Sequence, residues 1–329
     1  MSAEVGDISV AVASQRSPRR VPWQVKFGAL SLIWGSSFLL MKVGLRALAP
    51  LQISGLRIFA GCGVLVLLLR LSGGRLPRRR RTWAHLAVSA VFLCTLPFSL
   101  FALGEERVPS ALAAIGNSTT PVAAVIFGLL LLPGEPVGRR KLVGVVLGFV
   151  GVLILVQPWQ SAGRPDLVGF GMTLVAGASY GLGWVYTRRR LAEGDLGGLS
   201  LPTAQLTVAA GQMVLVLGVW WLLHRDRFAA PWSLVLPPAP VGAAPVSAVA
   251  PIVAVLVLGV VGTGIAMSFQ FDVVRAAGPT VGASVTYLIP VVSVALGVFV
   301  LAERLSWPEA VGAAVILCAA VLIQRPAHR

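Results

Sequence analysis

Residues 117–135 read NSTTPVAAVIFGLLLLPGE, and residues 286–303 read TYLIPVVSVALGVFVLAE. In each stretch a proline lies within an apolar run, a glutamate closes the run, and a glycine follows nine residues later. The two sets are Pro121, Glu135 and Gly144, and Pro290, Glu303 and Gly312. Five apolar spans separate equivalent points, and an odd number of membrane crossings turns the second copy upside down. The pattern therefore predicts an inverted repeat, a plan on which membrane proteins build two faces around one central site.

The composition places this repeat in a lipid bilayer. Apolar residues make up 57% of the chain and charged residues 12%, and the mean hydropathy is +0.86, which is far above the range of soluble domains. About 20 consecutive apolar residues cross the hydrocarbon core of a membrane. On this basis we predict ten spans, at 25–45, 51–71, 83–103, 110–132, 139–158, 167–186, 201–223, 250–271, 280–301 and 307–323.

The ten spans are predicted to be helices, because lipid cannot satisfy unpaired backbone groups and the runs show no strand alternation. The fold class is then an all-α integral membrane protein made of two inverted five-helix repeats, 25–158 and 159–323. A basic N-terminal tail, 1–24, precedes them and a short tail, 324–329, follows. The first apolar run is long enough to act as an uncleaved anchor, and Gly144 and Gly148, spaced as G-x-x-x-G, predict close helix packing.

The net charge of +15 is distributed unevenly between the predicted sides of the membrane. Segments on the side of the N-terminus hold 19 lysines and arginines, whereas segments on the other side hold 6. The positive-inside rule then puts both termini in the cytoplasm of a multi-pass cell-membrane protein. The run Arg78 to Arg81 is explained as a topology signal, so we expect no nucleic-acid partner.

Motifs in both halves are similar to those of a known family. The motifs are Trp34-Gly35-Ser36-Ser37-Phe38, Lys42, Arg57 and the two Pro…Glu…Gly copies. Their order and spacing resemble the EamA family of the drug/metabolite transporter superfamily, and the resemblance extends from about Trp23 to Ile323. It implies a ten-helix secondary transporter that moves small organic metabolites or drugs across the cytoplasmic membrane. One departure is Pro133-Gly134-Glu135-Pro136, where the family more often has Gly-Glu-Arg.

The two prolines indicate where a solute could bind. A proline inside a helix removes the hydrogen bond to the carbonyl four residues earlier. We therefore predict helix breaks at Pro121 and Pro290, which free the carbonyls of Asn117 and Thr286. Polar and aromatic side chains cluster at the same depth and form the candidate lining: Ser36, Ser37, Asn117, Thr120, Tyr180, Trp184, Thr286 and Tyr287. The alternative, in which both prolines only kink their helices for packing, is open.

Lys42 and Arg57 are the two cations within predicted spans. Charges at such depth often mark a solute pathway, although long side chains can also extend to the interface. If both side chains face the cavity, they favour a solute with a carboxylate or phosphate.

Other functions are compatible with single features of the sequence. A passive channel would use the same polar lining, whereas the inverted repeat favours alternating access. Gly177-Ala178-Ser179-Tyr180-Gly181 has the form of a serine-hydrolase motif, but it lies inside an apolar helix and no histidine lies at its depth. The sequence has no motif for a metal or cofactor, and its three cysteines suggest no disulfide framework. Both a monomer and a homodimer are compatible with it.

The acidic residues bear on the driving force. Glu105, Glu106 and Asp272 all lie near the ends of predicted spans, and no Asp, Glu or His lies at mid-membrane. Proton-coupled carriers usually need such a group. We therefore predict movement driven by the gradient of the solute itself, with Asp272 as the nearest candidate for a coupling residue.

Overall fold

A computed structural model describes residues 21–132, 138–160, 166–191, 196–235, 247–301 and 306–324 of this protein. All ten predicted spans are helical in it. Each span corresponds to one helical unit, by which we mean either a single helix or two consecutive helices that continue in the same direction. The ten units are α1 (Trp23–Gly35) with α2 (Ser37–Gly44); α3 (Pro50–Leu71); α4 (Arg80–Ala90) with α5 (Leu96–Arg107); α6 (Ser110–Asn117) with α7 (Thr120–Leu131); α8 (Arg139–Val156); α9 (Leu167–Leu191); α10 (Ser200–Leu223); α11 (Val249–Gly259) with α12 (Ala266–Ala277); α13 (Pro279–Leu301); and α14 (Trp307–Gln324).

Length and composition agree with a membrane location for the bundle. Seven of these units are long and apolar enough to cross a membrane, and α13 and α14 contain the shorter apolar stretches Pro279–Val292 and Ala310–Gln324. The remaining unit, α8, begins with three basic residues in its first turn, Arg139 to Lys141.

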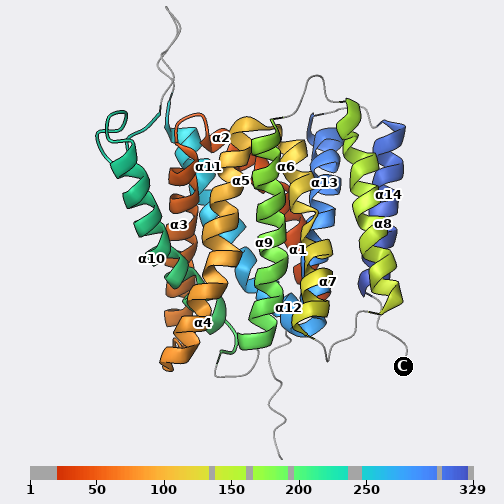
Figure 1. The fold of residues 1–329 in the computed structure, drawn as a ribbon, viewed down its shortest axis with the longest axis horizontal. Helices are drawn as coiled ribbons and strands as arrows, with labels where there is room; N and C mark the ends of the chain where they lie inside the picture. Colours follow the sequence, from red (N-terminus) through yellow and green to blue (C-terminus); the bar gives the residue numbers. More distant parts are fainter. Residues whose placement is uncertain are drawn as a thin grey trace, which may run out of the picture.

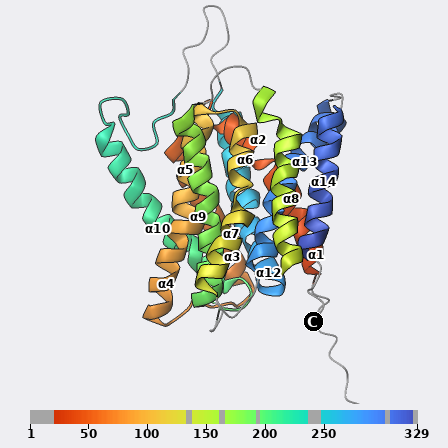
Figure 2. The same ribbon diagram turned by 45° about the vertical axis from the view of Figure 1, so that its right-hand side comes forward.

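Successive units alternate in direction through the bundle (Figure 1). We call the end at which α4 and α8 begin and α9 finishes the basic end, because it carries Arg80, Arg139 and Arg188 to Arg190. The other is called the opposite end. The first unit starts at the basic end, whereas α9, the sixth, starts at the opposite end (Figures 1 and 2). The second five units are therefore inverted relative to the first five.

The last helices of the two halves, α8 and α14, pack against each other through glycines. A methyl group added at Gly144 would lie 2.7 Å from Cγ1 of Ile323, and one added at Gly312 would lie 2.6 Å from the backbone nitrogen of Leu155. The two contacts are copies of one another, because 312 − 144 and 323 − 155 both give 168. The predicted close packing at Gly144 is confirmed. The paired glutamates of the repeat, Glu135 and Glu303, lie outside the described residues.

Several units are interrupted within their length. The first is broken at Ser36 and the fourth at Ser118 and Thr119, directly before Pro121. By contrast, α13 continues through Pro290, so the predicted break at this proline is not seen; loss of one hydrogen bond is not enough to end a helix whose neighbouring turns are intact. The third unit of each half contains a π-helical turn, η1 (Val91–Thr95) and η3 (Val260–Ile265), which no sequence pattern predicted.

The connection after α10 is tied to the body of the bundle. Its described part, residues 224–235, forms turns rather than a helix. The side-chain amide of Gln52 in α3 donates to the carbonyl oxygens of Pro231 and Ser233, at 2.9 and 3.0 Å. These bonds fix the connection over the opposite end of α3.

Candidate functional site

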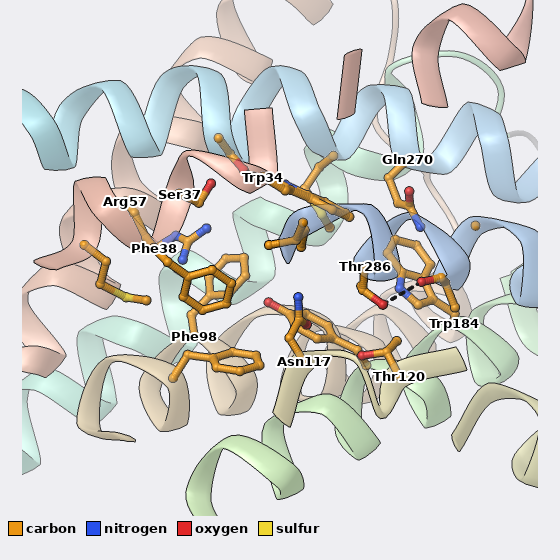
Figure 3. A pocket seen from close by; sticks show the side chains of 18 residues that line it. Trp34, Ser37, Phe38, Arg57, Phe98, Asn117, Thr120, Trp184, Gln270 and Thr286 are labelled. Atoms are coloured by element: carbon orange, nitrogen blue, oxygen red, sulfur yellow. Dashed lines mark hydrogen bonds between the residues drawn. The ribbon is translucent and has the colours of Figure 1, made fainter. Parts of the chain in front are cut away.

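A cavity lies between the two halves, lined by side chains from both (Figure 3). The first half contributes α1, α2, α3, α5, α6 and α7, and the second half contributes α9, η3, α12 and α13. The space not filled by atoms amounts to about 670 Å³, including the part open to the outside. Seven of the predicted site residues line it: Ser37, Arg57, Asn117, Thr120, Tyr180, Trp184 and Thr286.

Arg57 is the only charged side chain among the described lining residues. It is 6% exposed, although it belongs to a helix that crosses the apolar bundle. Its Nε donates to Oγ1 of Thr263 in η3, at 3.1 Å, and its guanidinium carbon lies 3.8 Å from the ring centre of Phe98. Within the described chain the two terminal nitrogens have no hydrogen-bond acceptor. A buried cation therefore has donors to offer to a ligand.

Two amide side chains in the lining also lack partners within the described structure. Oδ1 of Asn117 and both amide atoms of Gln270 are buried without a hydrogen bond. Figure 3 shows these two side chains on opposite sides of the cavity. Buried polar atoms are normally satisfied by protein, water or ligand. The amides are thus further points at which a bound molecule could be held.

Aromatic rings form much of the wall between these polar groups. The rings of Phe101 and Tyr180 are stacked with centres 5.9 Å apart, and Phe38 meets Phe101 edge-on at 5.8 Å. At the other side, Trp184 packs edge-on against Phe271, at 5.3 Å. Such rings bury apolar ligand surface and constrain its orientation.

Five predicted site residues lie outside the lining. The hydroxyl of Ser36 donates to the carbonyl of Ile33, and that of Tyr287 donates to the carbonyl of Val145, where the ring packs on Gly148. Nζ of Lys42 donates to the carbonyl oxygen of Glu105, at 2.6 Å. Pro121 and Pro290 are buried in their helices but do not line the cavity.

The sequence analysis missed several lining residues. They are Trp34, Phe38, Met41, Phe98, Phe101, Gly262, Met267, Gln270, Gly282, Ala283 and Ile289. Most are apolar and give no sign of their role in a chain that is apolar throughout. Gln270 could have been found, because it is an amide inside the predicted span 250–271.

Two sets of contacts join the first helical unit of one half to the third unit of the other. We call them seam A, between α1–α2 and α11–η3–α12, and seam B, between α9 and α4–η1–α5. In seam A the indole nitrogen of Trp34 donates to the carbonyl of Gly262 in η3, at 3.0 Å. In seam B the hydroxyl of Ser179 donates to the carbonyl of Phe92 in η1, at 2.9 Å. Each π-helical turn thus accepts a bond from the inverted partner half.

Each seam also ends in an ion pair. Lys26 pairs with Asp272 at the basic end of seam A, and Arg107 pairs with Asp166 at the opposite end of seam B, at 3.2 Å. In seam A the first helical unit supplies the base and the third unit supplies the acid. In seam B the third unit supplies the base, and the acid directly precedes the first unit. In seam B, Oδ1 of Asp166 also accepts the backbone N–H of Gly169, at 2.9 Å, and this bond with the nearby Arg107 lowers the pKa of Asp166 below its ordinary value.

Enzyme chemistry has no support in this geometry. Ser179, the serine of the hydrolase-like motif, uses its proton in the bond to Phe92, and of the described histidines His85 bonds Tyr186 and His224 bonds Trp220. In the part of the chain that the structure describes, no group of three His, Cys, Asp or Glu side chains could hold a metal ion.

Comparison with known proteins gives relatives along most of the chain. The "Uncharacterized inner membrane transporter YedA" of Escherichia coli K12 is 27% identical over 298 residues, which is 90% of this chain and 88% of the relative. The "Uncharacterized transporter YvbV" of Bacillus subtilis is 26% identical over 295 residues, 89% of this chain and 88% of that one. The "Probable amino-acid metabolite efflux pump" of E. coli K12 is 24% identical over 176 residues, 51% and 55% of the two chains.

The fold also has a counterpart among solved structures. One crystal structure superimposes with a TM-score of 0.66 at 20% identity, covering 91% of this chain and 95% of that one. Residues 24–157 and 167–325 each match the EamA-like transporter family. The duplicated match agrees with the two inverted halves of the bundle, and the chain belongs to the EamA-like transporter family.

Proposed function

We propose that this transporter is an alternating-access carrier for small organic molecules that combine a carboxylate with an apolar, preferably aromatic, body. The observation that carries the proposal is Arg57, a buried cation whose terminal nitrogens have no described acceptor, in a cavity between two inverted halves. The name of the relative that is called a probable amino-acid metabolite efflux pump supports a solute of this kind.

The lining suggests how such a molecule would be oriented. A carboxylate can accept two parallel hydrogen bonds from a guanidinium, and this geometry is specific as well as strong. The rings of Phe38, Phe101 and Tyr180 would cover the apolar body, and Asn117 and Gln270 would bond a further polar group such as an ammonium or hydroxyl.

The contacts at the two ends of the bundle support alternating access. At the basic end, Lys26 of the first repeat pairs with Asp272 of the second. At the opposite end, Arg107 of the first repeat pairs with Asp166 of the second, at 3.2 Å. The repeats 25–158 and 159–323 would move against each other by releasing one set of contacts at a time, around the cavity between them. The basic end would face the cytoplasm, with both termini, by the positive-inside rule.

Three related probes test the solute class in purified protein. L-Phenylalanine carries a carboxylate, an ammonium and a ring; 3-phenylpropionate lacks the ammonium; phenethylamine lacks the carboxylate. Because Trp34 and Trp184 line the cavity, binding can be followed by tryptophan fluorescence and by thermal stabilisation. We expect the two carboxylates to bind and phenethylamine not to bind.

Substitution of the buried cation gives the matched test. Arg57→Gln should weaken binding of the carboxylates by about 30- to 100-fold, since a charge-assisted hydrogen bond contributes about 2 to 3 kcal/mol. Arg46→Gln removes the same charge from an exposed site and should leave affinity unchanged. Equal binding of phenethylamine and 3-phenylpropionate would contradict the solute class.

Transport by alternating access is tested in proteoliposomes. Labelled L-phenylalanine should enter vesicles preloaded with unlabelled L-phenylalanine faster than it enters empty ones. In preloaded vesicles the carrier can bind unlabelled solute on the inside and return with it to the outside. A flux that rises linearly with concentration, without counterflow, would instead establish a channel.

A further inference from the structure

Glu105 is a carboxyl group enclosed by the bundle near its opposite end. It lies in the last turns of α5 and is 0% exposed. Neither of its carboxyl oxygens has a hydrogen-bond partner in the described structure. Its neighbour in the chain, Glu106, is exposed. Buried acidic side chains are rare unless they are paired, so this one needs a physical explanation.

Helix geometry relates Glu105 to the cavity. Phe98 and Phe101 both line the cavity, and Glu105 follows Phe101 by four residues. Residues four apart share one helix face, and the rise of 1.5 Å per residue places Glu105 about 6 Å further toward the opposite end. The carboxyl group therefore lies between the cavity and the surface that would open to admit or release a solute at this end.

The charged and titratable groups around Glu105 come from neighbouring helices. Lys42 in α2 and Arg57 in α3 act on its carboxyl group electrostatically, and the hydroxyl of Ser110 in α6 approaches it. From α9, Tyr180 stacks on Phe101, one helical turn before Glu105. Lys42 uses its ammonium on the carbonyl oxygens of Glu105 and Val108, at 2.6 and 3.4 Å, rather than on the carboxyl group. Arg57 uses Nε on Thr263. No described cation lies in ion-pair contact with the Glu105 carboxyl.

We propose that Glu105 is a proton-binding site whose occupancy controls the opening of the opposite end. In the arrangement seen here, in which Glu105 is fully buried, the carboxyl group holds its proton, because a buried carboxylate without an ion-pair partner is costly. When this end opens, water enters, the proton passes to it, and the ionised carboxylate takes Lys42 from the backbone carbonyls. The inference rests on the proposed carrier function, and it assigns proton binding to Glu105 rather than to Asp272, the nearest candidate for a coupling residue in the sequence.

The direction of the pH effect follows from this cycle. Opening releases a proton to the solution at the opposite end, so acidifying that solution favours the closed state and raising its pH favours the open one. Glu105→Gln keeps the shape of the protonated side chain but cannot ionise. It should hold this end closed at every pH.

Opening can be measured without any solute. In a background lacking Cys62, Cys94 and Cys318, the cavity variant Ser37→Cys is labelled from the opposite end with an impermeant maleimide, and each rate is divided by that of the exposed variant Arg46→Cys. The ratio removes the pH dependence that the two thiol reactions share. We expect the ratio to fall several-fold on acidification with Glu105 present. In Glu105→Gln it should be low and independent of pH.

Two further variants keep the test decisive. Glu106→Gln removes the same charge one residue away and should retain the full pH dependence. Lys42→Met removes the partner of the ionised carboxylate and should move the midpoint upward by about one pH unit. A pH-independent ratio in the protein with Glu105, or an unchanged pH dependence in Glu105→Gln, would overturn the proposal. Binding of L-phenylalanine and 3-phenylpropionate, measured separately, would still decide the proposed function.

Discussion

Seam A and seam B join the same pair of helical units in inverted copies, and they differ in where they hold charge. In both, the first unit of one half bonds a π-helical turn in the third unit of the other, through Trp34 or Ser179. In both, an ion pair closes one end. Only seam B buries an acidic side chain, Glu105, whereas the corresponding acid near the end of seam A, Asp272, is partly exposed and paired with Lys26 and Arg275.

This difference distinguishes the structural features that both halves share through duplication from the side chains that are particular to one half. The π-helical turns, the bonds to their carbonyls and the terminal ion pairs recur, because they depend on the backbone path shared by both halves. Buried charge does not recur among the residues that the structure describes: Arg57 and Glu105 both belong to the first half, whereas the second half contributes the uncharged Gln270 and Trp184. A symmetric scaffold thus surrounds an asymmetric site, so its two ends can respond to different stimuli.

The contact between α8 and α14 recurs in both halves, and substitutions in it should have the largest effect on the free energy of unfolding. Gly312→Ala would place a methyl group 2.6 Å from the backbone of Leu155, which cannot move aside, and we expect a loss of about 3 kcal/mol in the free energy of unfolding. Gly144→Ala meets the side chain of Ile323, at 2.7 Å, and should cost about 2 kcal/mol. Unfolding in detergent, followed by circular dichroism, measures both.

A glycine in open space provides the control for these two substitutions. A methyl group added at Gly218 in α10 would have no neighbour within 4 Å. Gly218→Ala should therefore be neutral or stabilise the protein by up to about 1 kcal/mol through helix propensity. If all three variants behave alike, the glycines do not set the distance between the halves.

The hydrogen bonds to the π-helical turns give the next largest effect. Ser179→Ala should lower the free energy of unfolding by about 1 kcal/mol, because the Phe92 carbonyl loses its donor inside the bundle. Trp34→Phe should cost at least as much, since it removes the bond to Gly262 and part of a ring. If the seams are independent, the double variant should equal the sum within about 0.5 kcal/mol. A larger deviation would show that the two π-helical turns are coupled.

The ion pair of seam A should contribute less. The side chains of Lys26 and Asp272 are 19% and 34% exposed, so solvent screens their attraction. Asp272→Asn should cost about 0.5 kcal/mol at low salt and less at high salt. Unfolding at two ionic strengths distinguishes this from a cost that is insensitive to salt, which would mean that the pair is shielded from water.

The ion pair of seam B should have the smallest effect and one that depends on pH. The pKa of Asp166 is lowered in the folded state, so its stabilising contribution is present above the unfolded-state pKa and is lost as the pH falls through the folded-state value. Asp166→Asn should therefore reduce stability slightly at neutral pH and not at a pH below the folded-state pKa. Unfolding of both proteins at the two pH values tests this, and an equal difference at both would contradict it.

Hydropathy was sufficient to predict the ten helical units, but not which side of each helix faces the cavity. Neighbouring residues on a helix point about 100° apart, so of two adjacent polar residues only one is expected to face a given cavity. Ser37 and Thr286 line it, whereas Ser36 and Tyr287 point elsewhere. In a membrane helix the apolar residues surround the whole circumference, so no amphipathic stripe distinguishes these directions.

The π-helical turns and the burial of Glu105 could not be predicted from the sequence either, and the reason is a different one. A π-helical turn depends on which donors approach its carbonyls, and in η1 and η3 these donors come from helices distant in sequence. Glu105 and Glu106 look equivalent in the sequence at the end of one apolar run. The packing of α5 against α9 and α2 encloses one and leaves the other exposed. Both outcomes are set by tertiary contacts.

The glycine contact between α8 and α14 also determines the order in which the bundle can be completed during synthesis. The ribosome delivers α8 when half of the spans have been made, but its partner α14 is the last span to emerge. The face of α8 around Gly144 and Gly151 therefore stays uncovered by α14 in the membrane until the rest of the chain has been inserted. Closure of the bundle is left to its final helix, so a chain truncated before α14 would retain most of the cavity lining and lack the contact that joins the two halves on that side.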